Sequence, residues 1–176
     1  PTTAASEAFH FSYDLYYALV VGNGAAVADL TVGPSTTNNA LDGFTMQMQS
    51  GSGTITSLVV SGTGSFTSTN IPTNGVKVWR DLGTIGSYDA GVDVQISSAS
   101  TAIAGNATTV TISNEAVNTT LQNYLVTVDI TATPTNGQTI TGAVTSVTGV
   151  AGVRYQDTSS ATLTISTAAA NLTVGN

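Results

Sequence analysis

The chain has 176 residues, a net charge of −7 and only 7% charged residues, against about 25% in an ordinary soluble domain. Its three basic residues, Lys77, Arg80 and Arg154, are too few for the phosphate contacts of a nucleic-acid-binding protein. The 41% of hydrophobic residues can fill a core, and the 32 Thr and 18 Ser supply most of the polarity, so the composition predicts an all-β protein.

The N-terminal segment is the part of the sequence that is densest in aromatic residues. Apolar side chains recur at every second position, as on one face of an extended strand: Phe9, Phe11, Tyr13, Leu15, Tyr17, Leu19 and Val21. Two interpretations follow. The segment is either the first core strand of its own domain or an arm that fills the sheet edge of a neighbouring subunit. The second interpretation divides the chain into an arm, residues 1–21, and a sandwich domain, residues 22–176.

Short alternating runs follow along the rest of the chain. They predict strands near residues 27–32, 44–48, 55–60, 76–79, 92–96, 110–112, 124–130, 140–150, 163–165 and 172–174. Asn-Gly pairs at 23–24, 74–75 and 136–137 and the Asp-Gly pair at 42–43 predict tight hairpin turns. The pattern predicts a single Ig-like or jelly-roll-type β-sandwich with an N-terminal extended arm. The longest apolar run, residues 16–21, is far shorter than the roughly 20 residues of a membrane span.

Three stretches resemble the Ig-like sandwich modules of bacterial and archaeal surface proteins. They are residues 76–81 (VKVWRD), 88–93 (YDAGVD) and 124–133 (YLVTVDITAT), within a likeness that covers roughly residues 42–150. The resemblance implies a secreted or cell-surface sandwich. Because the loop after the Arg-Asp pair often binds Ca²⁺ in such modules, it also implies metal ligands at Asp81, Asp89 and Asp93. A solvated hairpin without metal is the alternative, since Ca²⁺ takes six to eight oxygen ligands.

Candidate catalytic groups are few. His10 is the only histidine and there is no cysteine, so a catalytic triad, a thiolate nucleophile and a zinc site all lack their usual residues. The ten carboxylates are scattered, and no pair is marked as an acid–base couple. We therefore expect no enzyme and no required cofactor. Three sequons mark candidate glycosylation sites, a number that chance alone could supply in so Asn- and Thr-rich a chain: Asn106, Asn118 and Asn171.

These features predict a structural subunit of an extracellular filament, a pilus-like or biofilm-matrix fibre that polymerises head-to-tail by β-strand donation. The expected partners are copies of the same chain and surface glycans. The architecture is similar to the secreted fibre proteins of the TasA-like kind and to archaeal bundling pili and threads. Because the chain opens with Pro1, we interpret it as a product of signal-peptide removal. The alternative is a cell-surface or S-layer-type module that binds carbohydrate or Ca²⁺. Exposed Trp79, Tyr88 and Tyr155 near Asp81 and Asp89 would support this alternative.

Overall fold

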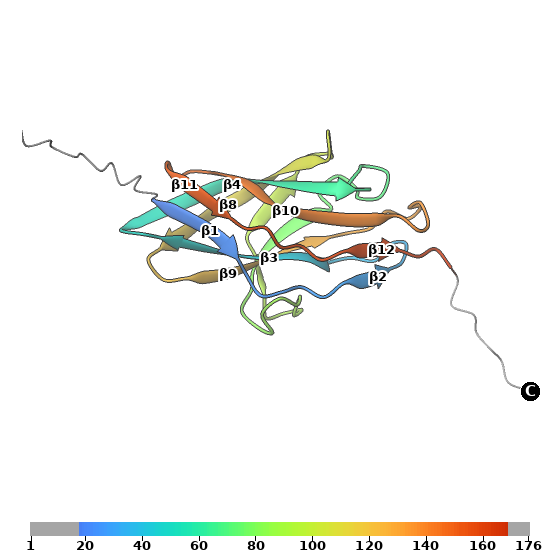
Figure 1. The fold of residues 1–176 in the computed structure, drawn as a ribbon, viewed down its shortest axis with the longest axis horizontal. Coiled ribbons are helices and arrows are strands. Elements are labelled where there is room, and N and C mark those ends of the chain that lie inside the picture. Colours follow the sequence, from blue (N-terminus) through green and yellow to red (C-terminus); the bar gives the residue numbers. More distant parts are fainter. Residues whose placement is uncertain (1–17, 169–176) are drawn as a thin grey trace, which may run out of the picture.

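The computed structural model describes residues 18–168, and these form two packed β-sheets without any helix (Figure 1). Sheet A has the strand order β11-β1-β3-β9-β5-β6. Its strands are β1 (Leu19–Asn23), β3 (Asn39–Met48), β5 (Val76–Arg80), β6 (Val94–Gln95), β9 (Gln122–Val128) and β11 (Val153–Gln156). The all-β sandwich predicted from the sequence is confirmed.

Sheet B has the strand order β2-β12-β10-β4-β8-β7. Its strands are β2 (Leu30–Val32), β4 (Ser52–Gly64), β7 (Ser97–Ser100), β8 (Ala107–Asn118), β10 (Thr139–Thr148) and β12 (Leu163–Ile165). Strands were predicted from alternation at most of these places. Strand β7 (SSAS) and strand β11 (VRYQ) were missed because they carry few apolar residues. The strand predicted at 172–174 lies outside the described residues.

The core fills the space between the sheets. Its members are mainly the inward-facing alternate residues of β3, β4, β8, β9 and β10, as expected for aligned sheets about 10 Å apart. Phe44 and Tyr124, on neighbouring strands, stack with their ring centroids 5.3 Å apart. Phe66 and Ile71, in the connection from β4 to β5, are fully buried as well. This connection therefore closes part of the core.

The first and last strands run side by side and in the same direction. Strand β1 pairs in parallel with β11, and β2 pairs in parallel with β12. The chain therefore crosses from sheet A to sheet B twice along this side of the sandwich, once between β1 and β2 and once between β11 and β12. The described chain enters at one end of the sandwich and leaves at the opposite end (Figure 1).

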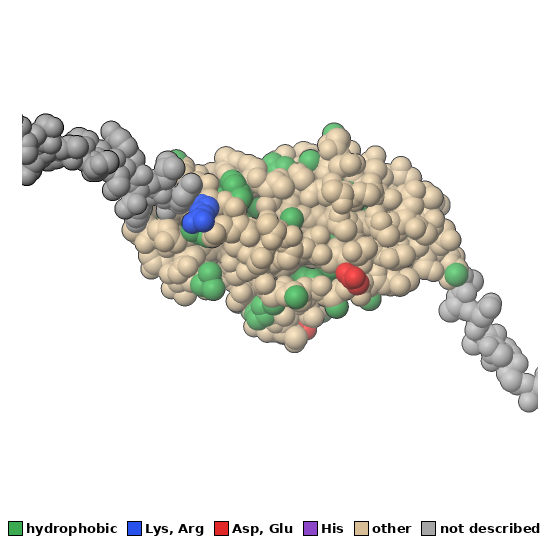
Figure 2. Space-filling view, viewed as in Figure 1, with side chains coloured by type: hydrophobic (Ala, Val, Ile, Leu, Met, Phe, Trp, Pro, Cys, Tyr) green, Lys and Arg blue, Asp and Glu red, His purple; other side chains and the backbone are tan. Residues whose placement is uncertain are grey.

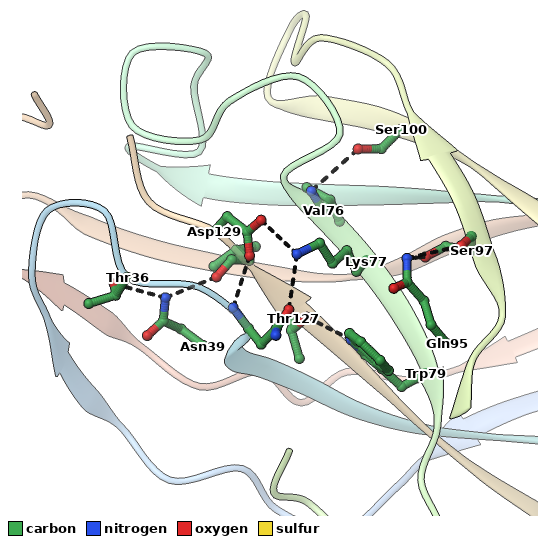
Figure 3. Close-up of polar contacts among 12 residues, drawn as sticks. Thr36, Asn39, Val76, Lys77, Trp79, Gln95, Ser97, Ser100, Thr127 and Asp129 are labelled. Carbon is green, nitrogen blue, oxygen red and sulfur yellow. Dashed lines mark hydrogen bonds and ion pairs between the residues drawn. The ribbon is translucent and has the colours of Figure 1, made fainter. Parts of the chain in front are cut away.

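On the other side of the sandwich, serine side chains complete the edge of β5. The chain passes there from β6 of sheet A into β7 of sheet B. The Ser97 hydroxyl accepts a hydrogen bond of 3.0 Å from Val78 N. The Ser100 hydroxyl accepts one of 3.3 Å from Val76 N (Figure 3). These hydrogen bonds satisfy donors that would otherwise be exposed at a sheet edge.

Lys77 and Arg80, both in β5, form ion pairs with residues of other segments. The Lys77 ammonium lies 2.7 Å from a carboxylate oxygen of Asp129 and 3.0 Å from the side-chain oxygen of Asn38 (Figure 3). The Arg80 guanidinium lies 2.8 Å from both carboxylate oxygens of Glu115, so this pair is bidentate and joins β5 to β8 across the two sheets.

None of the four predicted turns is a hairpin between paired strands. The prediction at 42–43 is wrong, because Asp42 and Gly43 lie inside β3. Residues 23–24 end β1, which pairs with β3 and β11 and not with the next strand. The turns at 74–75 and 136–137 exist, with positive φ at Asn74 and Gly137, but each connects strands of opposite sheets.

Candidate functional site

The connection between β5 and β6, residues 81–93, covers the outer face of sheet A. Trp79 and Leu125 are register partners on that face, yet Trp79 is 8% exposed and Leu125 is fully buried. The ring of Tyr88 lies 4.7 Å from the Trp79 ring, centroid to centroid, and Trp79 Nε1 donates a 2.8 Å hydrogen bond to Thr127. Loop and sheet thus form a small second core outside the main one.

Three aspartates hold this connection by accepting hydrogen bonds from its backbone. Asp81 accepts from Gly86 N at 2.7 Å, and Asp89 accepts from Thr84 N. Asp93 accepts from Leu82 N and Gly83 N with Oδ1 and from Asp89 N with Oδ2. Acidic side chains in this loop therefore replace the regular backbone pairing that a strand would have.

The residues expected from the resemblance to be Ca²⁺ ligands, Asp81, Asp89 and Asp93, do come together in this one loop. Four of their six carboxylate oxygens accept backbone hydrogen bonds, and Asp81 Oδ1 is buried without a partner. Burial is the main cause that raises the pKa of Asp81, and the nearby Asp93 and Asp89 add to it. Within residues 18–168, no group of three or more His, Cys, Asp or Glu residues is arranged to hold a metal ion.

Replacing Asp93 with alanine should loosen this loop while leaving the sandwich folded. The variant loses the acceptor for three backbone N–H groups, so we expect about 1–2 kcal/mol less stability in denaturant unfolding. Amide exchange should accelerate at Leu82, Gly83 and Asp89. Asp93→Asn keeps one acceptor oxygen, so it should lose less stability than Asp93→Ala. Unchanged exchange at these three amides in Asp93→Ala would show that other contacts hold the loop.

The aromatic residues proposed for the alternative binding module do not form one exposed platform. Trp79 is buried under the loop. Tyr88, a residue of that loop, is half-buried against the Trp79 ring. Tyr155 is 40% exposed, but it lies in β11, at the opposite edge of sheet A from β6, and its hydroxyl accepts a 2.7 Å hydrogen bond from Val147 N. A sugar ring could therefore not stack on these three residues together.

Of the residues predicted for the subunit interface, two lie in the described chain. Leu19 and Val21 are fully buried in β1, where they pair in register with Met48 and Met46 of the same chain. Strand β1 thus extends across the boundary proposed at residue 21. The other predicted interface residues lie outside the described residues: Phe9, Phe11, Tyr13, Leu15 and Tyr17.

Two of the three candidate glycosylation sites are exposed in the structure. Asn106 lies next to the start of β8 with a φ of 60°, and Asn118 ends the same strand. The side-chain oxygen of Asn118 accepts a hydrogen bond from Thr120 N at 2.8 Å. Asn171 lies outside the described residues.

A surface feature that sequence inspection missed is an apolar corner patch at one edge of sheet A. Its four members are each about half exposed, between 47% and 54%: Leu82, Val92, Val94 and Leu121. Leu82 and Leu121 line one open cavity of about 480 Å³ together with Arg80, and Val94 is the register partner of Arg80. Exposed apolar groups gathered next to a short edge strand mark a possible contact surface.

Comparison with known proteins assigns no family. No protein-family model matches the chain, and no curated protein matches its sequence at a significant level. The two-sheet fold is compatible with an Ig-like module, so the coarse part of the resemblance, the sandwich, agrees with the structure. Because sandwiches serve many unrelated functions, the function has to be argued from surfaces and sites.

Proposed function

We propose that this chain is a structural subunit of an extracellular filament and that it polymerises head-to-tail by donating its N-terminal segment to the next subunit. The observation that carries the proposal is the alternating aromatic run, residues 9–17, which precedes a β1 already paired on both sides within its own sheet. The run therefore supplies further apolar, strand-forming residues in addition to β1, which already serves as the first strand of the sandwich. Strand addition uses this pattern, because alternate side chains enter pockets on the acceptor.

The corner patch is the proposed acceptor. Strand β6 is the edge strand of sheet A and is only two residues long, so the acceptor edge is short. Val94 lies in this strand and Val92 in the turn just before it, and both are about half exposed. A contact between the N-terminal run and this patch joins two different surfaces. Repetition of it gives an open filament rather than a closed dimer.

The low surface charge supports a subunit that is covered by copies of itself. The six strands of sheet B contain a single ionisable residue, Glu115, and it is 5% exposed and paired with Arg80. The outward side chains of this sheet are largely hydroxyls that bond to one another, as in Ser61 with Thr145 and Thr63 with Thr141. Charged side chains are also sparse on the face shown in Figure 2. Contacts between such faces bury almost no unpaired charge.

The test uses two variants that should each fail to polymerise for a different reason. One lacks residues 1–17 and so lacks the donor. The other carries Val94→Lys and Leu121→Lys in the acceptor. Under negative-stain electron microscopy, we expect filaments from the full chain and none from either variant, with all three chains folded by circular dichroism.

Mixing the two variants distinguishes strand donation from a nonspecific loss of contacts between subunits. The acceptor variant still has a donor segment and the truncated variant still has the patch, so the mixture should yield a one-to-one dimer in analytical ultracentrifugation. Filaments from the truncated chain would overturn strand donation. A full chain that stays monomeric at high concentration would overturn the filament itself. Filaments from the acceptor variant would leave donation standing and place the acceptor elsewhere.

A further inference from the structure

A carboxylate is buried in the middle of sheet A without a hydrogen bond of regular geometry among the described residues, although the backbone N–H of Val144 is near enough to lower its pKa. Asp42 lies in β3 at the bulge after Ala40, and it is fully buried. Neither of its carboxylate oxygens accepts a hydrogen bond of regular geometry from a described residue. An ionised carboxylate in such a place costs several kcal/mol by desolvation, unless it is neutralised.

The group that faces Asp42 is a second carboxyl, that of Asp157. Asp157 lies just after β11, in the irregular segment 157–162 that leads to β12. Its Oδ2 accepts a 3.4 Å hydrogen bond from Val144 N of β10, and its Oδ1 is buried without a partner. The two side chains are within hydrogen-bonding reach of each other. Two carboxyl groups form such a bond only when one of them carries a proton.

Among the described residues, no Lys or Arg is a cause that shifts the pKa of either carboxyl. Strands β1, β10 and β12 contain no titratable residue, and β9 contributes only Tyr124, whose hydroxyl bonds to Glu115 and Gln122. Lys77 and Arg80 are engaged with Asp129 and Glu115. Burial first, and then the neighbouring Asp157, raises the pKa of Asp42 to about 9, and burial also raises the pKa of Asp157.

We propose that Asp42 and Asp157 share a proton and that this proton latches the segment between β11 and β12 onto the sandwich. When the proton leaves, two like charges face each other inside the protein. Asp42 is fixed within a central strand, whereas Asp157 belongs to a half-buried irregular segment, so the segment is the part that moves. The latch is independent of the proposed filament, because it involves only contacts within one chain.

The other attachments of the segment among the described residues are single hydrogen bonds, most of them exposed. Ser159 Oγ donates to the Asn23 side chain at 3.4 Å, and Leu30 N donates to Thr162 O at 3.2 Å. Thr158 N donates to the Asn23 side chain at 2.7 Å, Thr162 N donates to Asp29 at 2.7 Å, and Ala161 N donates to Leu41 O at 2.7 Å. Among the described strands, β11 pairs with β1 alone, and the Tyr155 hydroxyl adds a contact with Val147 N of β10. Release of the segment would therefore expose the outer edge of β1 and loosen β12 on β10.

The sign of the pH dependence follows from the raised pKa values. The stability given by the protonated pair is fully present below the ordinary pKa of an aspartate, 3.8, and it is lost as pH rises through the folded value of about 9 for Asp42. Between these limits the folded chain holds one proton that the unfolded chain has released. The unfolding equilibrium constant should then rise about tenfold per pH unit from this group.

The test compares the full chain with Asp42→Asn, in denaturant unfolding at several values between pH 5 and pH 8. The asparagine amide can donate to Asp157 without a proton from solvent. The pH dependence of the unfolding free energy should therefore correspond to about one proton fewer in the variant than in the wild type. The variant should become more stable than the wild type toward pH 8. Asp29→Asn removes an exposed carboxylate that contacts the same segment, and it should leave the slope unchanged.

Amide exchange of residues 153–165, corrected for the intrinsic pH dependence, locates the motion. Wild-type exchange there should match that of Asp42→Asn at pH 5 and exceed it at pH 9. An equal pH dependence of the unfolding free energy and equal amide exchange in the two proteins would overturn the latch. If Asp42→Asn does not fold, Asp157→Asn supplies the same comparison. If Ca²⁺ stabilises the wild type at pH 8 but not the variant, the two carboxylates hold a cation instead, and the shared proton is overturned.

Discussion

Replacing Arg80 with methionine is expected to lower the free energy of unfolding by about 1–3 kcal/mol, because it leaves the buried carboxylate of Glu115 without its partly exposed cation. Glu115 is 5% exposed, and Arg80 contacts both of its oxygens at 2.8 Å. Tyr124 donates a further hydrogen bond of 3.0 Å to the same carboxylate, and burial raises the pKa of this phenol, so it stays a donor. Chemical denaturation at pH 7 measures the loss.

Two companion variants separate the buried charge from the packing. Arg80→Lys keeps a positive charge but not the planar fork, so it should recover only part of the loss. The double variant Arg80→Met with Glu115→Met removes both charges and should recover most of it, because apolar pairs often replace buried ion pairs at little cost. A single Arg80→Met variant as stable as the wild type would mean that Glu115 does not depend on Arg80.

Replacing Gly43 with alanine is expected to destabilise the sandwich by about 1–3 kcal/mol, the usual cost of forcing an atom into packed structure. A Cβ at Gly43 would meet the backbone oxygen of Ala25, and one at Gly24 would lie 2.6 Å from the backbone of Gly43. These are backbone contacts, which cannot rotate away as a side chain can. Thermal and denaturant unfolding of the variant measure the effect.

Gly33→Ala is the matched control for this prediction. The nearest atoms to a Cβ at Gly33 lie 3.9 Å away, and its φ is not in the left-handed region, so this substitution should change stability by less than about 0.5 kcal/mol. A Gly43→Ala variant with wild-type stability would show that the connection from β1 to β2 can lift off sheet A freely.

The Asp42–Gly43 pair shows why sequence reasoning reached the fold class but not all of its details. Asp-Gly is a strong local signal for a turn, and it predicted one here. In the structure, the glycine is needed for the close approach of residues 24–25, and the aspartate faces Asp157. Both requirements come from segments distant in the chain. A local pattern cannot report them.

The core strands were predictable because each carries its own alternation. Tyr124, Val126 and Val128 face the core as their spacing predicts, and so do Phe44, Met46 and Met48. The order of the strands was not predictable in this way, since most consecutive strands lie in opposite sheets.

The resemblance to surface modules pointed to the acidic loop, residues 81–93. It did not indicate that this loop covers Trp79. Exposure of Trp79 and Tyr88 was the feature that would have supported the binding-module interpretation. The structure buries Trp79 between loop and sheet. The corner patch was missed for a similar reason: Leu82, Val94 and Leu121 are isolated in sequence and meet only at a sheet edge.

The first and last strands run in the same direction, and this determines how the domain responds to tension. The described chain enters at the start of β1 and leaves after β12 at the far end (Figure 1). A pull on these two points acts along the strands, at right angles to the antiparallel hydrogen bonds between β1 and β3 and between β10 and β12. Those bonds are then sheared together rather than opened one after another. The topology thus gives the domain the geometry of a mechanical clamp between its two ends.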